Sequence, residues 1–155
     1  HFTDVQDCFL HAYAEFGNQI IDEVAQAVAA SETAGSEPMR AAYRTIFTLL
    51  DEDRDVAQAF WLDAVSAGPG YAETRQRIYG GFAELLRIGY AQRRELESEL
   101  PEPIESAYAA AVGMAAEMVI LAVLSGEEVD TDAMVEDAVT FTLAILQAQP
   151  LPADG

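Results

Sequence analysis

The sequence predicts an all-α protein, a bundle of about six helices. Apolar residues recur at spacings of three and four along most of the chain, which is the period of an amphipathic helix. The breaks between these segments contain glycine, proline or clustered acidic residues, and no segment alternates in the way that is typical of a strand. With 155 residues, 51% of them hydrophobic, the chain is suited to a single domain with a full core.

The first helix is expected to follow Asp4, a suitable N-cap, and to continue to about Ala30. The only cysteine, Cys8, lies in its second turn. Free cysteines are commonly buried, so we expect Cys8 to be a small core residue. A single cysteine cannot form an intramolecular disulfide, which suits a reducing cytoplasm. The apolar stripe of this helix consists of Phe9, Tyr13, Phe16, Ile20, Val24 and Val28.

Two shorter helices are expected next, after a loop over residues 31–38. The second helix should begin near Met39 and end at the acidic residues 51–53. The third carries Phe60 and Trp61 and should end before the sequence Gly68-Pro69-Gly70, because glycine and proline together strongly favour a turn.

Three longer helices complete the predicted bundle. The fourth should run from about Tyr71 to Leu96. The fifth is expected to have Pro103 in its first turn and Gly126 at its C-terminal end, the positions at which helices favour these residue types. Asp130 or Thr131 should cap the sixth helix, and residues 150–155 are expected to be a disordered tail.

The fifth helix is apolar on nearly its whole circumference. Between Ala107 and Leu124 its only charged residue is Glu117. Such a helix must be buried on most sides, either in a protein core or in a membrane. The stretch is at the short limit for a membrane span, it has a glutamate at its middle, and both flanks are acidic. These features favour a helix buried in protein.

Two apolar stripes on the sixth helix, together with small residues on the fifth, indicate more apolar surface than a monomer needs. We therefore expect the last two helices to pair with those of a second copy in a four-helix interface with two-fold symmetry. A six-helix monomer with an apolar end is the alternative. The residues expected at the interface are Ala109, Gly113, Ala116, Met134, Ala138, Phe141 and Ile145.

The net charge excludes one class of function for these residues themselves. The chain has 27 acidic residues against 8 basic ones, all of them arginine, and its formal net charge is −19. A surface of this kind repels phosphate, so it does not form a nucleic-acid-binding face.

Three segments resemble TetR-type transcriptional regulators. The opening sequence HFTDVQDCFL is similar to the junction between the recognition helix and the first core helix in that family, where His1, Phe2, Asp4 and Phe9 fit the pattern. The sequence VAQAFWLDAV over residues 56–65, followed by Gly68-Pro69, resembles the family's short sixth helix. Residues 111–126 resemble its dimerisation helix. The order, lengths and loop positions of the helices carry the resemblance along nearly the whole chain.

The sequence departs from the family pattern at two positions. Val5 stands where the family usually has a lysine, and Cys8 stands where it usually has a leucine. That lysine typically contacts a DNA phosphate, so its replacement puts a backbone contact at this point in doubt.

The resemblance implies that residues 4–149 are the effector-binding and dimerisation domain of a repressor, and that residues 1–3 are the end of a helix-turn-helix head lying upstream of His1. A small apolar or aromatic effector would control operator binding allosterically, with the first helix as the lever. The implied partners are a second copy of the chain, the effector and operator DNA. The resemblance implies a cytoplasmic regulator that is not an enzyme, needs no cofactor and does not contact a membrane.

Bulky residues that face inward are the candidates for a ligand site. Aromatic and methionine side chains suit an apolar, adaptable pocket; core packing is the favoured interpretation of any single aromatic, and it is the set as a whole that indicates a cavity. Glu117 is a lone carboxylate in an apolar helix and needs a partner. This partner is either an arginine such as Arg87 or Arg94 at the dimer interface or a cationic ligand. The predicted site residues are Tyr13, Phe16, Phe47, Phe60, Trp61, Tyr79, Phe82, Met114, Glu117 and Met118.

Two other classes of function stay open on the sequence. One is a free-standing dimeric helical module that binds a small molecule without binding DNA. The other is a lyase or isomerase with Glu117 as its base, but this needs a second titratable group that the sequence does not supply. No metal site is expected, because Asp7, Cys8 and His11 belong to no larger cluster of ligands.

Overall fold

The computed structural model describes residues 4–31 and 35–149, and the described residues form helices and no strand. This confirms the predicted all-α class. The expected end of a DNA-binding head at residues 1–3 and the expected tail at 150–155 lie outside the described residues. The helices are α1 (Val5–Ala30), α2 (Glu37–Glu52), α3 (Arg54–Trp61), the 3-10 helix η1 (Asp63–Ala67), α4 (Tyr71–Leu96), α5 (Ser106–Ser125) and α6 (Thr131–Leu146).

Aspartate side chains cap three of the helices, as short acceptors at an N-terminus should. The Asp4 carboxylate accepts a hydrogen bond from the Asp7 backbone N–H at 2.8 Å, which confirms the predicted start of α1. Asp53 caps α3 through the Val56 N–H in the same way. At α6, Asp130 rather than Thr131 is the cap.

Proline and glycine mark the other helix ends. Gly68 and Gly70 form the turn before α4 with φ values of 77° and 97°, and Gly126 ends α5 with φ of 69°, conformations that favour glycine. Two predicted starts were wrong. α2 begins at Glu37, two residues early, because Pro38 is accommodated in its first turn. α5 begins only at Ser106, and Pro103 lies buried in the connection before it.

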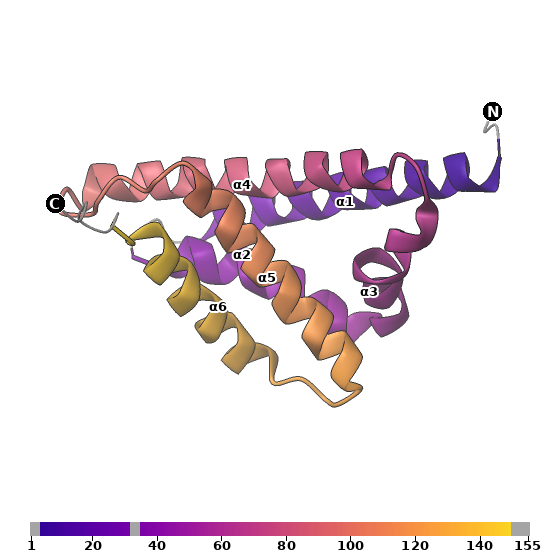
Figure 1. The fold of residues 1–155 in the computed structure, drawn as a ribbon. Helices are drawn as coiled ribbons and strands as arrows, with labels where there is room; N and C mark the ends of the chain where they lie inside the picture. Colours follow the sequence, from indigo (N-terminus) through magenta and orange to yellow (C-terminus); the bar gives the residue numbers. More distant parts are fainter. Residues whose placement is uncertain (1–3, 32–34, 150–155) are drawn as a thin grey trace, which may run out of the picture.

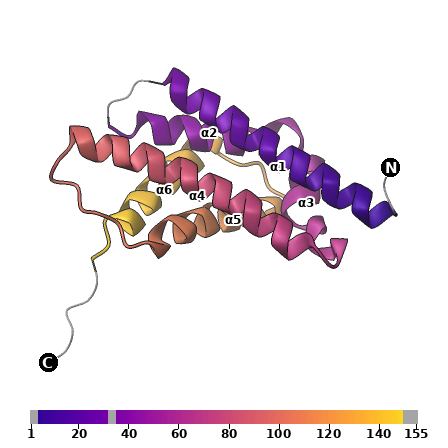
Figure 2. The same ribbon diagram turned by 90° about the horizontal axis from the view of Figure 1, so that it is seen from above.

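The two long helices, α1 and α4, lie side by side and form one edge of the molecule (Figure 1). In this view α5 and α6 lie below the α1–α4 edge, and α3 lies below the part of the edge that is nearer to the N-terminus. Seen from above, α2 lies beneath α1 (Figure 2), and it contacts α1 and α6. The core therefore sits between the α1–α4 pair and the helices α2, α3, α5 and α6.

Buried apolar residues from all six α-helices form the core. Its largest fully buried side chains are Phe47, Ile20, Tyr90 and Leu146. The prediction that Cys8 belongs to this core is wrong, since Cys8 is exposed. The reason is visible in Figure 1, where the first turns of α1 extend beyond the neighbouring helices; Val5 there is 87% exposed.

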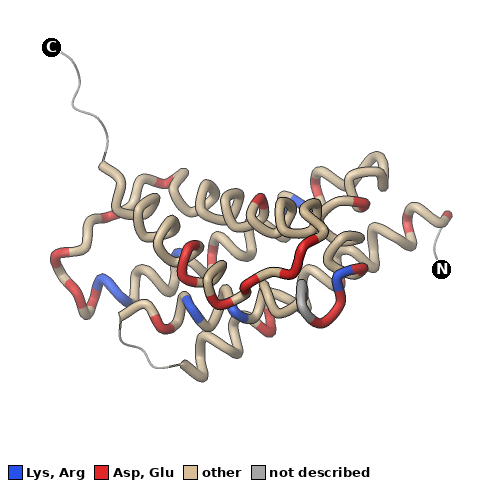
Figure 3. Tube along the Cα trace, turned by 90° about the horizontal axis from the view of Figure 1, so that it is seen from below, with Lys and Arg blue, Asp and Glu red and all other residues tan. Residues whose placement is uncertain are grey.

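α5 is long and apolar enough to cross a membrane by length and composition, with a mean hydropathy of 2.0, and 39% of that stretch is buried inside the protein. It packs against α3, α4 and α6, with a weaker contact to α2. Its remaining apolar surface is exposed, as at Leu121 and Leu124. Acidic residues are spread over the rest of the molecule (Figure 3), in agreement with the net charge of −19.

Candidate ligand cavity

A cavity of about 640 Å³ that is open to solvent is lined by residues of α1, α2, α3, α4 and α5, and some of these residues, such as Ile88 and Leu96, are exposed. Sites for small organic molecules usually measure about 300–1,000 Å³. The wall is mainly apolar. Helix α4 supplies one side of it, with Tyr79, Phe82, Leu85, Leu86 and Gly89, and α5 supplies the other, with Val112, Ala115, Ala116 and Val119.

Four of the ten predicted site residues line this cavity, namely Phe60, Trp61, Tyr79 and Phe82. Three others form a second layer. The Tyr13 and Phe16 rings lie 4.7 and 5.2 Å from the ring of Phe60, and the Phe47 ring stacks on Tyr43 at 5.6 Å. Contact with a ligand stays a prediction for all seven.

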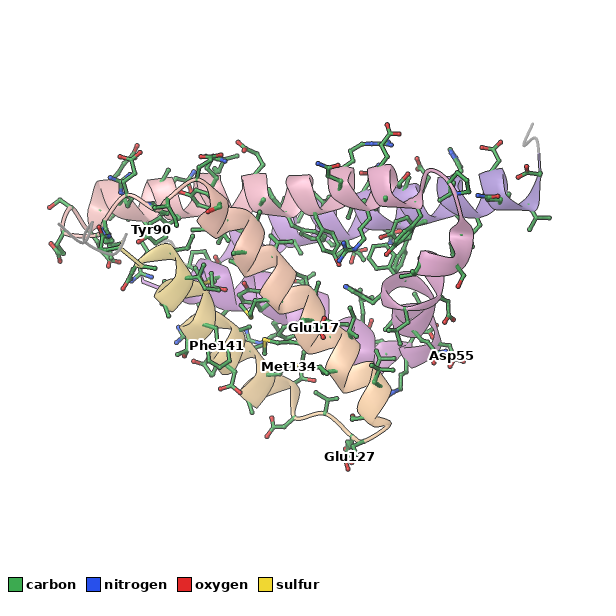
Figure 4. All side chains as sticks on the ribbon, viewed as in Figure 1. Asp55, Tyr90, Glu117, Glu127, Met134 and Phe141 are labelled. Carbon is green, nitrogen blue, oxygen red and sulfur yellow. The ribbon has the colours of Figure 1, made fainter. Side chains whose placement is uncertain are left out.

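The remaining three predicted residues are on α5 and do not line the cavity. Met114 and Met118 are half-buried, and Met118 packs against the core. Glu117 is exposed, so the expectation that it needs a buried partner loses its physical basis (Figure 4). Arg87 and Arg94, its suggested partners, instead pair with Glu105 and Glu102 within the same chain.

Sequence reasoning missed the residues that create the empty space. Ala42, Gly89, Ala115 and Ala116 line the cavity with little or no side chain. A Cβ atom added at Gly89 would meet no heavy atom within 4 Å. The cavity could therefore have been predicted from the small residues on α2, α4 and α5 rather than from the positions of the large ones.

Two polar side chains of the wall, Tyr43 and Arg93, already have partners within the protein. Tyr43 and Thr142 share a buried hydrogen bond between their hydroxyl groups, and burial raises the pKa of Tyr43. Beside the α1–α2 connection, Arg93 Nε and Nη2 donate to Glu97 at 3.0 and 3.1 Å, and Arg93 Nη1 donates to the Ser36 hydroxyl at 3.3 Å. The charge of Arg93 is thus already compensated within α4.

At the α3 end, three tyrosines and one arginine adjoin the cavity. The Arg75 guanidinium lies over the Tyr79 ring, 4.2 Å from its centroid. The Tyr71 ring is 5.5 Å from that of Tyr13. Burial is the main cause that raises the pKa values of Tyr13 and Tyr79, and Arg75 opposes this rise at both, so these hydroxyls remain protonated hydrogen-bond donors at neutral pH.

The seven residues expected at a dimer interface divide into two groups. Ala116, Met134 and Ala138 are buried by the protomer's own core, and Ile145 is half-buried. Ala109, Gly113 and Phe141 are exposed, and a Cβ at Gly113 would meet nothing within 4 Å. Figure 4 shows Met134 between α5 and α6, and Phe141 on the outer side of α6.

Two large apolar residues that were not predicted also lie exposed on α5. Leu121 is 58% and Leu124 65% exposed, against 49% for Phe141 of α6. They follow Gly113 and Glu117 along one stripe, since these positions are separated by steps of three and four. The exposed stripe of α5 therefore keeps Ala109 and Gly113 of the predicted set but continues through Glu117, because Ala116 is buried.

Within residues 4–31 and 35–149, no group of three or more metal-ligating side chains is found. No family model matches the sequence, and a search of curated proteins gives no match. Among solved structures, the chain is similar to the fatty acid degradation regulator FadR from Bacillus halodurans, a TetR-family protein. The TM-score is 0.75 at 18% identity, and the match covers 92% of this chain and 76% of that one. The match is to a regulator and not to an enzyme. At this identity the likeness establishes the architecture: the chain has the all-helical fold of a TetR-type regulator.

Proposed function

We propose that this chain is the ligand-binding and dimerisation domain of a TetR-like transcriptional repressor, and that a small apolar or aromatic effector bound in the cavity controls its affinity for DNA. The observation that supports this most directly is the cavity itself, about 640 Å³ of space with a mainly apolar wall. A ligand bound there would remove this apolar surface from water and gain van der Waals contacts with it.

Helix α1 supplies the coupling in this proposal. Val24, Ala25 and Val28 of α1 line the cavity, while the first turns of the same helix lie at the opposite end of the molecule (Figure 1). In a TetR-like protein a helix-turn-helix head would be joined at that end. A ligand that favours one placement of α1 would shift the placement of the head, by no more than its differential affinity for the two states.

The exposed apolar stripes of α5 and α6 support the second part of the proposal, which is a homodimer. Leu121, Leu124 and Phe141 would be covered by the same residues of a second copy, and Ala109 and Gly113 would allow close approach of the helices. The partners of the protein are then a second copy, the effector and operator DNA, in the cytoplasm and without a cofactor.

The single tryptophan gives a direct test. Trp61 lines the cavity, so a bound effector should change its fluorescence. Gly89→Leu places a side chain in the cavity and should abolish the response to any effector found in a screen of apolar and aromatic molecules. Gly80→Leu is the matched control, because Gly80 is in the same helix, has equally open space and does not line the cavity. Equal responses from both variants would contradict the proposal.

A free-standing dimeric module that binds a small molecule without binding DNA is the alternative. The full-length gene product separates the two. A regulator should retard DNA from its own promoter in a mobility-shift experiment and lose this ability when the effector is added. A module would bind the same effector and never retard DNA.

A further inference from the structure

The Arg75 side chain differs from every other half-buried arginine that the structure describes. Arg40, Arg87, Arg93 and Arg94 pair with carboxylates. Arg54 donates to the backbone carbonyls of Ala122, Val123 and Glu127 at the end of α5. Arg75 has no described carboxylate within ion-pair distance and lies over an aromatic ring. In a chain with 27 acidic residues, a half-buried cation without an anion is unusual.

The position of Arg75 on α4 relates it to the cavity. The lining residues Tyr79, Phe82 and Leu86 follow Arg75 at steps of four, three and four, so all of them lie on one face of the helix. Tyr79 is part of the cavity wall and also carries the guanidinium on its ring. Arg75 therefore lies one turn beyond the apolar cavity, behind its Tyr79 wall.

The surroundings of Arg75 fit an anion better than a cation. Tyr13, Tyr71 and Tyr79 carry hydroxyl groups that can donate hydrogen bonds to an oxyanion. Glu117 of α5 is near enough to act on Tyr79, but it forms no ion pair with Arg75 and is exposed. A planar guanidinium matches a carboxylate with two parallel hydrogen bonds.

We propose that the effector is a carboxylate with a long apolar body, its chain in the cavity and its carboxylate on Arg75 and the tyrosines around it. This rests on the proposed function, because it assigns the ligand class of the same cavity. The opposite end is not suited to the carboxylate, since Arg93 there is already held by Glu97.

Three amphiphiles of equal chain length test the assignment: dodecanoate, dodecanol and dodecylamine, each below its critical micelle concentration. Calorimetric titration of the purified protein should give an affinity for dodecanoate about tenfold to a hundredfold above that for dodecanol, the usual effect of a charge-assisted hydrogen bond. Arg75→Gln should lower the dodecanoate affinity to the dodecanol level and leave dodecanol unchanged. Arg77→Gln, at an exposed arginine two residues away, should change neither.

Arg75→Lys keeps the charge but loses the planar fork, so its dodecanoate affinity should fall between those of the wild type and Arg75→Gln. If Arg75→Gln does not fold, the wild type and Arg75→Lys decide the matter alone. Dodecanol or dodecylamine binding as tightly as dodecanoate, or an Arg75→Gln variant with unchanged dodecanoate affinity, would overturn this inference and leave the proposed function standing. Failure of all three amphiphiles to bind, together with a silent Trp61 in the wider screen, would overturn both.

Discussion

The side chain of Ile78 from α4 packs directly against Gly17 of α1. A Cβ atom added at Gly17 would lie 2.5 Å from Ile78 Cδ1, a distance that real Cβ atoms essentially never show. The reverse contact is present one turn further on, where a Cβ at Gly81 of α4 would lie 2.7 Å from Ile21 Cδ1 of α1. The two glycines allow the longest helices of the protein to pack closely, and this contact would carry any shift of α1 that a ligand causes.

Gly17→Ala should destabilise the protein by about 1–3 kcal/mol, the usual cost of overpacking a close contact, reduced by the better helix propensity of alanine. Gly81→Ala should cost less than Gly17→Ala, because its Cβ would come closer than 3.4 Å only to Ile21 Cδ1, the end of a flexible side chain. Gly80→Ala is the control, because a Cβ there meets nothing and removing a mid-helix glycine should stabilise by about 0.5–1 kcal/mol. Urea unfolding measures all three, and a destabilised Gly80→Ala variant would refute this account of the adjacent glycines.

The hydrogen bond between Tyr43 and Thr142 ties α2 to α6 in a fully buried setting. Thr142→Val should cost about 1–3 kcal/mol, because it leaves the Tyr43 hydroxyl without its partner. The double variant Tyr43→Phe/Thr142→Val removes both polar groups and should recover most of that loss. A double-mutant cycle from denaturant unfolding checks this, and strictly additive losses would mean that the two hydroxyls do not interact.

Leu121→Glu and Phe141→Glu should weaken self-association by placing charge on the exposed apolar face of α5 and α6. We expect sedimentation velocity to show a dimer for the wild type and mainly monomer for the double variant. Val65→Glu is the control, because Val65 is 61% exposed on η1, away from these two helices. A wild-type monomer, or a dimer that only Val65→Glu dissociates, would place the interface elsewhere or remove it.

The exposed ion pair between Arg40 and Glu136 should make stability depend on pH. The hydrogen bond from Arg40 and its charge hold the pKa of Glu136 below the ordinary value. A lowered pKa in the folded state contributes stability above the unfolded pKa, and this contribution is lost as the pH falls through the folded pKa. Arg40→Gln should therefore flatten the fall in the urea midpoint on acidification, and Arg77→Gln should not. Parallel curves for both variants and the wild type would show that the pair contributes nothing.

The helices themselves could be predicted from local physics. Asp4 and Asp130 cap the beginnings of α1 and α6, and Gly126 caps the end of α5, as predicted. Capping could be predicted because it depends on hydrogen bonds and backbone angles within a few residues. The span of α4 agrees with its predicted bounds for the same reason, since a turn-forming segment precedes it. The start of α5 could not be predicted in this way, because Pro103 is buried in the connection before the helix and does not begin it.

The all-helical class, the helix order, the acidic surface and four residues of the cavity wall follow from the amino-acid sequence, because periodicity, charge and side-chain size are local properties. The packing of the helices, in contrast, sets which small residues leave the cavity empty, the exposure of Cys8 and Glu117, and the position of Arg75 behind Tyr79 without a carboxylate. These features depend on how helices far apart in the chain are rotated against one another. A rotation of one helical position, about 100°, exchanges a buried side chain for an exposed one, and periodicity alone does not fix it.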